Sequence, residues 1–509
     1  MTTFNLKGHY FNGEFHQVPT TGLAAAESYI ERPCPAKTNQ ILWSLPLDYR
    51  HVDPVIESAC HGFDYWRKLE LDKRISFLKS YQEQLISKQE QFATAIALEA
   101  GKPLWEAKTE AAALISKVDV TINESLKRIE QKNYQEILPK TQGALYFKPL
   151  GPSLIIGPFN FPCHLANGQI LSALIAGNSI IFKPSEKTCY SGELLIECFH
   201  QAGFPKGVIN LAQGDGETAR RMLKDKRIKG VFFTGSKEVG LKVLQSTHQD
   251  LSKLVSLELG GKNPAIVHKD ADFDFTLQEL LKGAFLTTGQ RCTSTSLVFI
   301  HHSMAQKFVE SFHQLAKKII VDHPIDHQRE PFMGPLIDQR SLDEYLLYMG
   351  MAKREGMEEI MRGKQLEREN PGFYVSPSIH YSDKFNFDGH FLASEIFGPN
   401  CSIIPYQDEE EAIALANSTE YGLACSVFTK DQSFFDLCVR DIDSGLINLN
   451  RSTVGASAKL PFGGVKNSGN YRPAAVSTID ACVYQMSSLQ SDHLEIQDLK
   501  DIKGLDPER

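Results

Sequence analysis

The chain has 509 residues, more than the ~300 at which a single hydrophobic core stops growing, so about two or three packed units are expected. Hydrophobic residues make up 42% and charged residues 23% of the sequence, which is typical of globular proteins and argues against a membrane protein. The formal net charge of -8 lacks the basic excess of nucleic-acid-binding proteins, so neither DNA nor RNA is expected as a partner.

The N-terminus and the cysteines exclude further classes of protein. Residues 1–9 lack the basic start and apolar run of a secretory signal. The longest apolar stretch, residues 170–182, is interrupted by polar residues and is shorter than the ~18 residues of a membrane span. We therefore expect a cytoplasmic protein with no membrane partner. The 10 cysteines include no CxxC pair, so the sequence predicts neither a disulfide framework nor a metal site.

The N-terminal third of the chain changes from turn signals to helical periodicity. Residues 1–51 contain turn clusters and no extended periodic pattern. Between residues 52 and 130 apolar side chains recur at three- and four-residue steps, and Gly101-Lys102-Pro103 divides this region. We expect from two to four long helices lying on a sheet. Residues 131–149 are polar and then alternate, which predicts a strand pair projecting from the body.

Strands and helices alternate between residues 153 and 257. The strand segments are short and apolar, and helical periodicity fills the intervals between them. This alternation implies βαβ crossovers and a parallel, doubly wound sheet. The predicted strands cover residues 153–157, 179–183, 208–211, 230–233 and 255–257, and the predicted helices cover residues 166–176 and 191–202 or begin at residues 217 and 237.

A second α/β block extends from residue 263 to residue 460. Residues 477–489 follow it with the alternation of an exposed edge strand, and residues 491–509 form a charged tail. Within the block, the predicted strands cover residues 264–267, 297–300, 401–404, 424–428 and 445–448, and the clearest helices cover residues 304–320 and 409–417.

A potential base and a potential nucleophile lie where the two blocks meet. Glu258 opens the segment Glu258-Leu259-Gly260-Gly261-Lys262, and Cys292 closes Gly289-Gln290-Arg291-Cys292. A carboxylate that activates water and a thiol that attacks a carbonyl suffice to make and then hydrolyse a thioester. Because a cysteine is more often a small buried apolar residue, the role of Cys292 depends on its neighbours.

Three further segments are candidates for ligand contacts, and each has a plainer alternative. Asn160 lies between aromatic residues and prolines, and it is either a satisfied core amide or a donor to an oxyanion. Lys183 and Glu186 follow a predicted parallel strand, where ligands bind, or they are solvent-facing charges. Gly235 and Ser236 lie at a strand-to-helix turn, which either binds a phosphate or only makes the turn.

Taken together and in their order, these motifs resemble those of the aldehyde dehydrogenase superfamily. Any one of them alone would be weak, but an ordered set that covers most of the chain is improbable by coincidence. The segments that carry the resemblance are Phe159-Asn160-Phe161-Pro162, Phe182-Lys183-Pro184-Ser185-Glu186, Phe233-Thr234-Gly235-Ser236, Glu258-Leu259-Gly260-Gly261-Lys262, Gly289-Gln290-Arg291-Cys292, Glu395-Ile396-Phe397-Gly398-Pro399 and Pro461-Phe462-Gly463-Gly464.

The resemblance implies an α/β, aldehyde dehydrogenase-like fold. Its parts would be a doubly wound parallel-sheet cofactor domain, an α/β catalytic domain and a small β oligomerisation arm. The arm implies a homodimer or homotetramer. The implied boundaries are residues 1–130 and 149–258 for the NAD-binding domain, 259–469 for the catalytic domain, 131–148 and 470–489 for the arm, and 490–509 for a C-terminal tail.

The resemblance also implies roles for individual residues. Cys292 is similar to the nucleophile, Glu258 to the base that activates the hydrolytic water, and Asn160 to an oxyanion donor. The implied cofactor is NAD rather than NADP, because a carboxylate at Glu186 would repel a 2′-phosphate, and no metal is needed. The residues implied in cofactor binding are Lys183, Glu186, Gly235, Ser236, Gly240, Glu395 and Phe397.

Two segments concern the aldehyde substrate. Residues 160–168 and 455–473 resemble the bacterial subfamily that oxidises N-succinylglutamate 5-semialdehyde in arginine catabolism, although Ser294 and Lys466 depart from its usual pattern. Another semialdehyde, an aliphatic aldehyde and a catalytically silent relative are alternatives, and Glu258 argues for water rather than coenzyme A as acyl acceptor. The candidates for substrate contacts are His164, Arg291, Arg451, Ser457 and Phe462.

Overall fold

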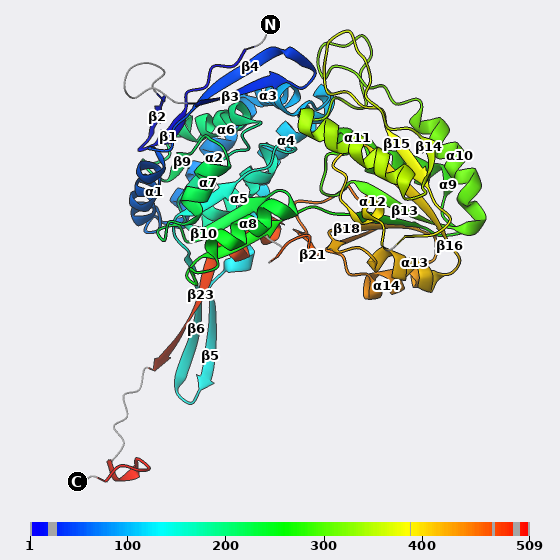
Figure 1. Cartoon of the computed structure of the whole chain (residues 1–509). Coiled ribbons are helices and arrows are strands. Elements are labelled where there is room, and N and C mark those ends of the chain that lie inside the picture. The colour runs from blue at the N-terminus through cyan, green and yellow to red at the C-terminus, as the bar shows by residue number, and fades with distance from the viewer. Residues whose placement is uncertain (1–2, 19–27, 387, 471–473, 492–498, 507–509) are drawn as a thin grey trace.

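The computed structural model describes residues 3–18, 28–386, 388–470, 474–491 and 499–506. Its body contains two seven-stranded sheets with their helices, and a narrow three-stranded sheet projects away from that body (Figure 1). We call the two large sheets the first and the second sheet, in chain order.

The first sheet has a parallel centre and an antiparallel edge. Five consecutive strands in its order are parallel to their neighbours, and the N-terminal hairpin joins antiparallel at one end. The strand order is β11 (Leu254–Glu258), β10 (Gly230–Thr234), β7 (Ser153–Ile156), β8 (Ile180–Lys183), β9 (Ile209–Leu211), β1 (His9–Phe11) and β2 (Glu14–His16).

Helices cover both faces of the first sheet. Successive side chains of a strand point to opposite faces, so neighbouring residues of one strand pack in different cores. Ile155 packs in one core with the helices α2 to α6, whereas its neighbours Leu154 and Ile156 pack in another with α1, α7 and α8. The helices are α1 (Val52–Trp66), α2 (Leu71–Ser87), α3 (Gln89–Ala100), α4 (Leu104–Val120), α5 (His164–Ala176), α6 (Cys189–Gln201), α7 (Gly216–Leu223) and α8 (Lys237–Thr247).

The second sheet is parallel except at β14, and it is also buried on both faces. Val298 packs against the side of α9 and α10, and Phe299 against the side of α11, α13 and α14. The order is β14 (Glu358–Met361), β15 (Ser378–Tyr381), β16 (Asn400–Tyr406), β13 (Thr295–His301), β12 (Asn263–Val267), β18 (Ala424–Phe428) and β19 (Leu446–Leu449), and the helices are α9 (Phe273–Phe285), α10 (Ala305–Ala316), α11 (Gln339–Arg354), α12 (His390–Ala393), α13 (Glu409–Asn417) and α14 (Gln432–Asp441).

The projecting sheet, which we call the arm, is antiparallel. In it, β23 (Val483–Ser491) pairs with β6 (Thr141–Pro149), and β6 pairs with β5 (Lys132–Leu138). Every residue of β5 is exposed. The smaller elements are β3 (Ser28–Cys34), β4 (Lys37–Leu47), β17 (Tyr421–Gly422), β20 (Pro461–Phe462), β21 (Val465–Lys466), β22 (Ala474–Ala475), η1 (Thr121–Ser125), η2 (Leu126–Ile129), η3 (Leu286–Gly289), η4 (His302–Met304), η5 (Val476–Cys482) and η6 (Leu499–Asp501).

The α/β fold class, with its doubly wound parallel sheet, is confirmed. The long helices predicted between residues 52 and 130 are α1 to α4, and the predicted strand pair at residues 131–149 is β5 with β6. Within the described ranges, no helix is both long and apolar enough to cross a membrane.

Two sequence predictions need correction. The edge strand predicted for residues 477–489 begins only at Val483, because the buried residues before it form the 3-10 helix η5 that packs against α5. The turn-rich residues 1–51 contain four strands, β1 to β4. Part of the predicted charged tail, residues 492–498 and 507–509, lies outside the described residues.

Candidate active site

Glu258 and Cys292 lie where the chain passes from the first sheet to the second. Glu258 is the last residue of β11, and the short segment after it leads directly into β12. Cys292 lies in the turn between η3 and β13, the strand that pairs with β12. The backbone of Glu258 is fixed, because its carbonyl accepts the Gly235 N–H at 3.0 Å, and its side chain is buried.

The surroundings of Cys292 favour its neutral thiol. Burial first, and then the charges of Glu258 and Glu395, raise the pKa of Cys292 to about 12 against the opposing charge of Arg291. Both carboxylates therefore lie close enough to the sulfur for their charges to act on it. A base must therefore remove the thiol proton before the sulfur can attack a carbonyl.

The turn that carries Cys292 is anchored from β12. The side-chain amide of Asn263 donates from Nδ2 to the carbonyl oxygens of Cys292 at 2.7 Å and Ser294 at 2.9 Å. A Cβ on Gly261 would lie 2.5 Å from the Cys292 carbonyl oxygen, so this close approach requires glycine. Gly261 is thus part of the support of the Cys292 turn.

Asn160 reaches the same turn from the first sheet. Its Nδ2 donates to the carbonyl oxygen of Gln290 at 2.9 Å, and its Oδ1 accepts the Phe161 N–H at 3.1 Å. The side chain is buried. Because a carboxamide has two N–H groups, Nδ2 can hold the turn and still donate to an oxygen bound near Cys292.

The cofactor candidates on the first sheet lie at the carboxyl ends of its strands. Lys183 ends β8 and is buried, with Nζ 3.9 Å from Glu186 Oε2 and 3.0 Å from the Pro184 carbonyl oxygen that it donates to. Ser236 caps α8, and its Oγ accepts the Val239 N–H at 3.4 Å. Close packing favours glycine at position 240, because a Cβ there would lie 2.7 Å from the Leu259 side chain.

The remaining cofactor candidates come from the second sheet's side. Glu395 accepts the Gly261 N–H at 3.0 Å, and a Cβ on Gly260 would collide with the Glu395 carboxylate. Burial raises the pKa of Glu395 to about 7. The ring of Phe397 packs edge-on against that of Phe159, with centroids 5.7 Å apart.

The structure separates the five substrate candidates into two groups. His164, Arg291 and Phe462 are at least partly buried, whereas Arg451 and Ser457 are exposed. His164 begins α5 and donates its N–H to Glu110 Oε1 at 3.1 Å. Arg291 donates from Nη2 to Glu106 at 2.5 Å and from Nε to Thr287 at 2.7 Å, so protein partners already hold its guanidinium.

A buried charged cluster beside the site was missed from the sequence. Lys102 pairs with Glu110 at 2.6 Å and lies 3.4 Å from the centre of the Phe161 ring. Glu106 accepts the Thr287 N–H and pairs with Arg291. The signal was present, because Lys102, Glu106 and Glu110 recur at four-residue steps within an apolar helical pattern, where charges are costly unless paired.

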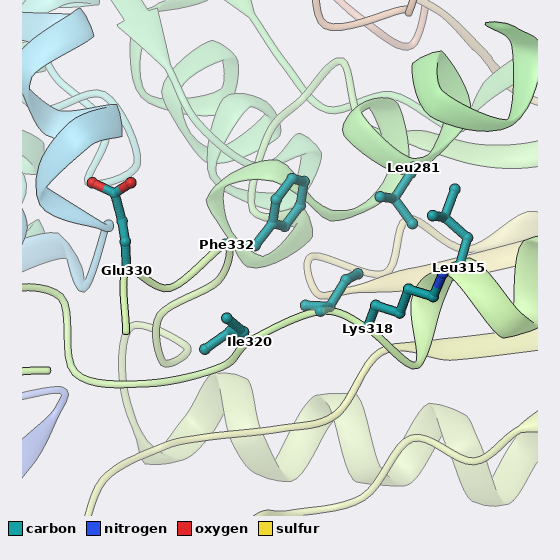
Figure 2. A pocket seen from close by; sticks show the side chains of 7 residues that line it. Leu281, Leu315, Lys318, Ile320, Glu330 and Phe332 are labelled. Atoms are coloured by element: carbon teal, nitrogen blue, oxygen red, sulfur yellow. The ribbon is translucent and has the colours of Figure 1, made fainter. Parts of the chain in front are cut away.

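A pocket elsewhere in the molecule contains none of these residues. Figure 2 shows this cavity of about 150 Å³, formed by α9, α10 and the segment that leads to Phe332. Its lining includes Leu281, Leu315, Lys318, Ile320, Glu330 and Phe332.

Comparison with known proteins agrees with this geometry. The profile of the Aldehyde dehydrogenase family matches residues 23–487, and the chain belongs to that family. It is 36% identical over 448 residues to an N-succinylglutamate 5-semialdehyde dehydrogenase of Novosphingobium aromaticivorans, a match that covers 87% of this chain and 92% of that protein. It is 35% identical over 492 residues to the protein of the same name from Legionella pneumophila, covering 95% of each.

Solved structures of the family share the fold. An NAD-dependent aldehyde dehydrogenase from Sinorhizobium meliloti has a TM-score of 0.90 and 26% identity, covering 96% of this chain and 95% of that one. A betaine aldehyde dehydrogenase from Staphylococcus aureus, solved in complex with NAD+, has a TM-score of 0.89 and 25% identity over 96% of each chain. The resemblance predicted from the motifs is confirmed.

Proposed function

We propose that this chain is an NAD-dependent dehydrogenase that oxidises N-succinylglutamate 5-semialdehyde to N-succinylglutamate in arginine catabolism. Relatives of that name match the chain at 35–36% identity over most of its length. The observation that carries the chemistry is the meeting of a buried carboxylate, Glu258, a thiol, Cys292, and an amide, Asn160, where the two sheets join. We further propose that it works in the cytoplasm as a homo-oligomer.

In the proposed mechanism Cys292 is the nucleophile and Glu258 the base. Because burial and nearby carboxylates keep the thiol neutral, loss of its proton to a base precedes attack on the aldehyde carbon. The oxygen of the adduct gains negative charge, and the Asn160 side chain and the Cys292 N–H donate to it, an effect of about 3 kcal/mol per donor. Glu258 then deprotonates a water, which releases the acid from the thioester and restores the thiol.

The residues at the ends of the first sheet's strands fit NAD. The buried cation of Lys183 lies near the half-exposed carboxylate of Glu186, a pair suited to ribose hydroxyls, and the α8 N-terminus at Gly235 and Ser236 suits a pyrophosphate. Glu395, whose charge acts on the Cys292 sulfur, and Phe397, which packs against Phe159, come from the second sheet's side. The chemistry that bound NAD supplies is hydride acceptance, which converts the adduct into the thioester.

The domain assignment is part of the proposal. Residues 1–130 and 149–258 would bind the cofactor, and residues 259–469 would supply the nucleophile. Residues 131–148 and the β23 part of the expected segment 470–489 would form the assembly arm, because η5 in that segment packs against α5, and residues 490–509 would be a tail. The arrangement of the two large sheets supports this division, because Glu258 ends the last strand of the first sheet and Cys292 precedes β13 of the second.

The test measures NADH formation with N-succinylglutamate 5-semialdehyde, glutamate 5-semialdehyde, succinate semialdehyde and butanal. We expect the highest kcat/KM for the first of these. Cys292→Ala should abolish NADH formation, because no thioester can form. Glu258→Gln should release one burst of NADH, equal at most to the enzyme concentration, and then stall at the thioester.

Three results would contradict the proposal. Turnover by Cys292→Ala would exclude the thiol mechanism, and steady turnover by Glu258→Gln would exclude that residue as the hydrolytic base. A higher kcat/KM for butanal than for N-succinylglutamate 5-semialdehyde in the wild-type protein would refute the assigned substrate. Cys60→Ala is the matched control for the thiol, since Cys60 is also only partly buried but lies on α1, and it should leave kcat unchanged.

A further inference from the structure

A buried lysine near the proposed substrate residues takes no part in the mechanism. Lys117, on the last turn of α4, is only 2% exposed. Its Nζ donates to the Ala475 carbonyl oxygen at 2.9 Å. Among the described residues, no carboxylate lies within ion-pair distance of Lys117. A buried ammonium with a single neutral acceptor is costly to fold, because an ionised group loses its hydration without gaining a counter-charge.

Lys117 lies beside one of the segments that the sequence assigns to the substrate and bonds to a strand that pairs with the other. Its Cε passes over Gly168 of α5, at 3.2 Å from where a Cβ would be. His164 lies four residues earlier on the same helix face, and its Nδ1 is buried with no hydrogen-bond partner in the described part of the chain. Ala475, which accepts the bond from Lys117, belongs to β22, and β22 pairs with β20 at Phe462.

We propose that the ammonium group of Lys117 binds the carboxylate of an acidic semialdehyde, with His164 as a neighbouring polar contact. This inference rests on the proposed function and names the residue that would select an acidic substrate. An ammonium group has three N–H donors, and one is used by Ala475, so donors remain for a carboxylate. A bound anion would supply the counter-charge that this buried cation lacks, which makes the site selective for acidic over neutral aldehydes.

Gly168 supports the same assignment. Apart from its own helix, Gly168 has only Lys117, of the described residues, within 4 Å of a Cβ built there, so the absence of a side chain leaves space that Lys117 uses. Alanine would otherwise suit this helical position better than glycine. Gly168→Ala is therefore a variant that shifts Lys117 without removing it.

The test compares KM for N-succinylglutamate 5-semialdehyde with KM for butanal, a neutral aldehyde. Lys117→Met keeps the side chain's length and removes its charge, and we expect KM for the acidic substrate to rise about tenfold or more, with KM for butanal within about twofold. Lys117→Arg should keep most of the preference. Gly168→Ala should raise KM for the acidic substrate alone.

Lys253→Met is the matched control. Lys253 is another buried lysine whose Nζ donates to backbone carbonyls, those of Leu223 and Asp225, and it immediately precedes β11. Its replacement tests the loss of a buried amine elsewhere in the fold, and both KM values should stay unchanged. A selective change in KM from Lys253→Met would overturn the assignment of selectivity to Lys117.

The pH dependence gives a second measurement. Burial lowers the pKa of Lys117 to about 8, so its charge is present below that pH and is lost above it. The titratable groups that face it are His164 on α5 and Cys482 in η5. Burial lowers the pKa of His164 and raises that of Cys482, so both stay neutral between pH 7 and 9. The ratio of kcat/KM for the acidic to the neutral aldehyde should fall above pH 8 in the wild type and stay flat in Lys117→Arg.

Failure of this inference differs from failure of the proposed function. If the wild-type protein prefers N-succinylglutamate 5-semialdehyde, but Lys117→Met changes both KM values equally or neither, the assignment of Lys117 is wrong. If the wild type shows no such preference, the substrate proposal itself is wrong. If Lys117→Met does not fold, Gly168→Ala and the wild-type pH profile test the inference instead. Equal changes in KM for the two aldehydes in Gly168→Ala, together with a ratio of kcat/KM that stays flat with pH in the wild type, would overturn it.

Discussion

The reactivity of Cys292 depends on residues that hold its turn rather than on contacts to the sulfur alone. Asn263 and Asn160 bond to carbonyl oxygens of the turn, and Gly261 allows the close backbone approach. Glu106 holds the other end, where Thr287 and Thr288 have positive φ values of 56°, a conformation that non-glycine residues adopt at a cost. The turn is therefore supported from α4, β12 and the loop after β7 at once.

Glu106 is the residue on which this support depends most. Burial alone would raise its pKa, but the charges of Arg291 and Lys102 outweigh burial and lower the pKa, so Glu106 is ionised. We predict that Glu106→Gln lowers kcat by roughly 10- to 100-fold, because the neutral amide no longer balances Arg291 and the turn shifts. Steady-state kinetics at a temperature where circular dichroism shows both proteins folded would measure this.

The control for Glu106 is an exposed ion pair with the same chemical change. Glu90 pairs with Lys108 at 3.1 Å with both side chains exposed, and Glu90→Gln should leave kcat within about twofold. Glu106→Asp keeps the charge and should recover part of the activity. An unchanged kcat in Glu106→Gln would show that Glu106 does not position the turn.

At the scale of helices and strands, the sequence predicts an element well when the element is apolar along its whole length. The strands β7 and β8 are buried at every position and were predicted within a residue of their bounds. By contrast, β2 and β14 are short strands with charged residues at sheet edges, and tertiary pairing rather than local pattern decides their structure. Likewise, no local pattern shows that Lys117 packs against α5 at Gly168.

The close packing of α1 against the turn before β9 is a property of two elements together. A Cβ on Gly62 would lie 2.1 Å from the backbone of Gly207, and a Cβ on Gly207 would lie 2.3 Å from the Ser58 carbonyl oxygen. We predict that Gly62→Ala lowers the free energy of unfolding by about 1–3 kcal/mol, although alanine is the better helix former, because the methyl forces the two backbones apart.

Urea denaturation would measure this effect, with His61→Ala as the control. His61 is the neighbouring residue of the same helix and is exposed, so its replacement should change the free energy of unfolding by less than about 0.5 kcal/mol. If Gly62→Ala were as stable as the wild type, the separation between α1 and this turn would have to be adjustable at little cost.

At the scale of the whole molecule, the two large sheets bring the proposed reacting groups together, and the arm leaves an unpaired surface. The proposed site uses the carboxyl ends of parallel strands in the first sheet and the turn before β13 in the second, which explains why segments far apart in sequence meet there. The arm, in contrast, projects away from both sheets (Figure 1).

The arm's outer strand predicts an assembly of identical chains. On β5, Tyr134, Ile137 and Leu138 are 44%, 50% and 51% exposed, and an exposed apolar edge strand favours pairing with another chain. We expect light scattering to give the wild-type protein a mass of at least two chains, and the double change Ile137→Asp with Leu138→Asp to give that of one. Replacing the polar residues Lys132 and Asn133 of the same strand by Asp should preserve the assembly, since it removes no apolar surface. A wild-type monomer, or a double variant of unchanged mass, would exclude the arm's edge as the assembly surface.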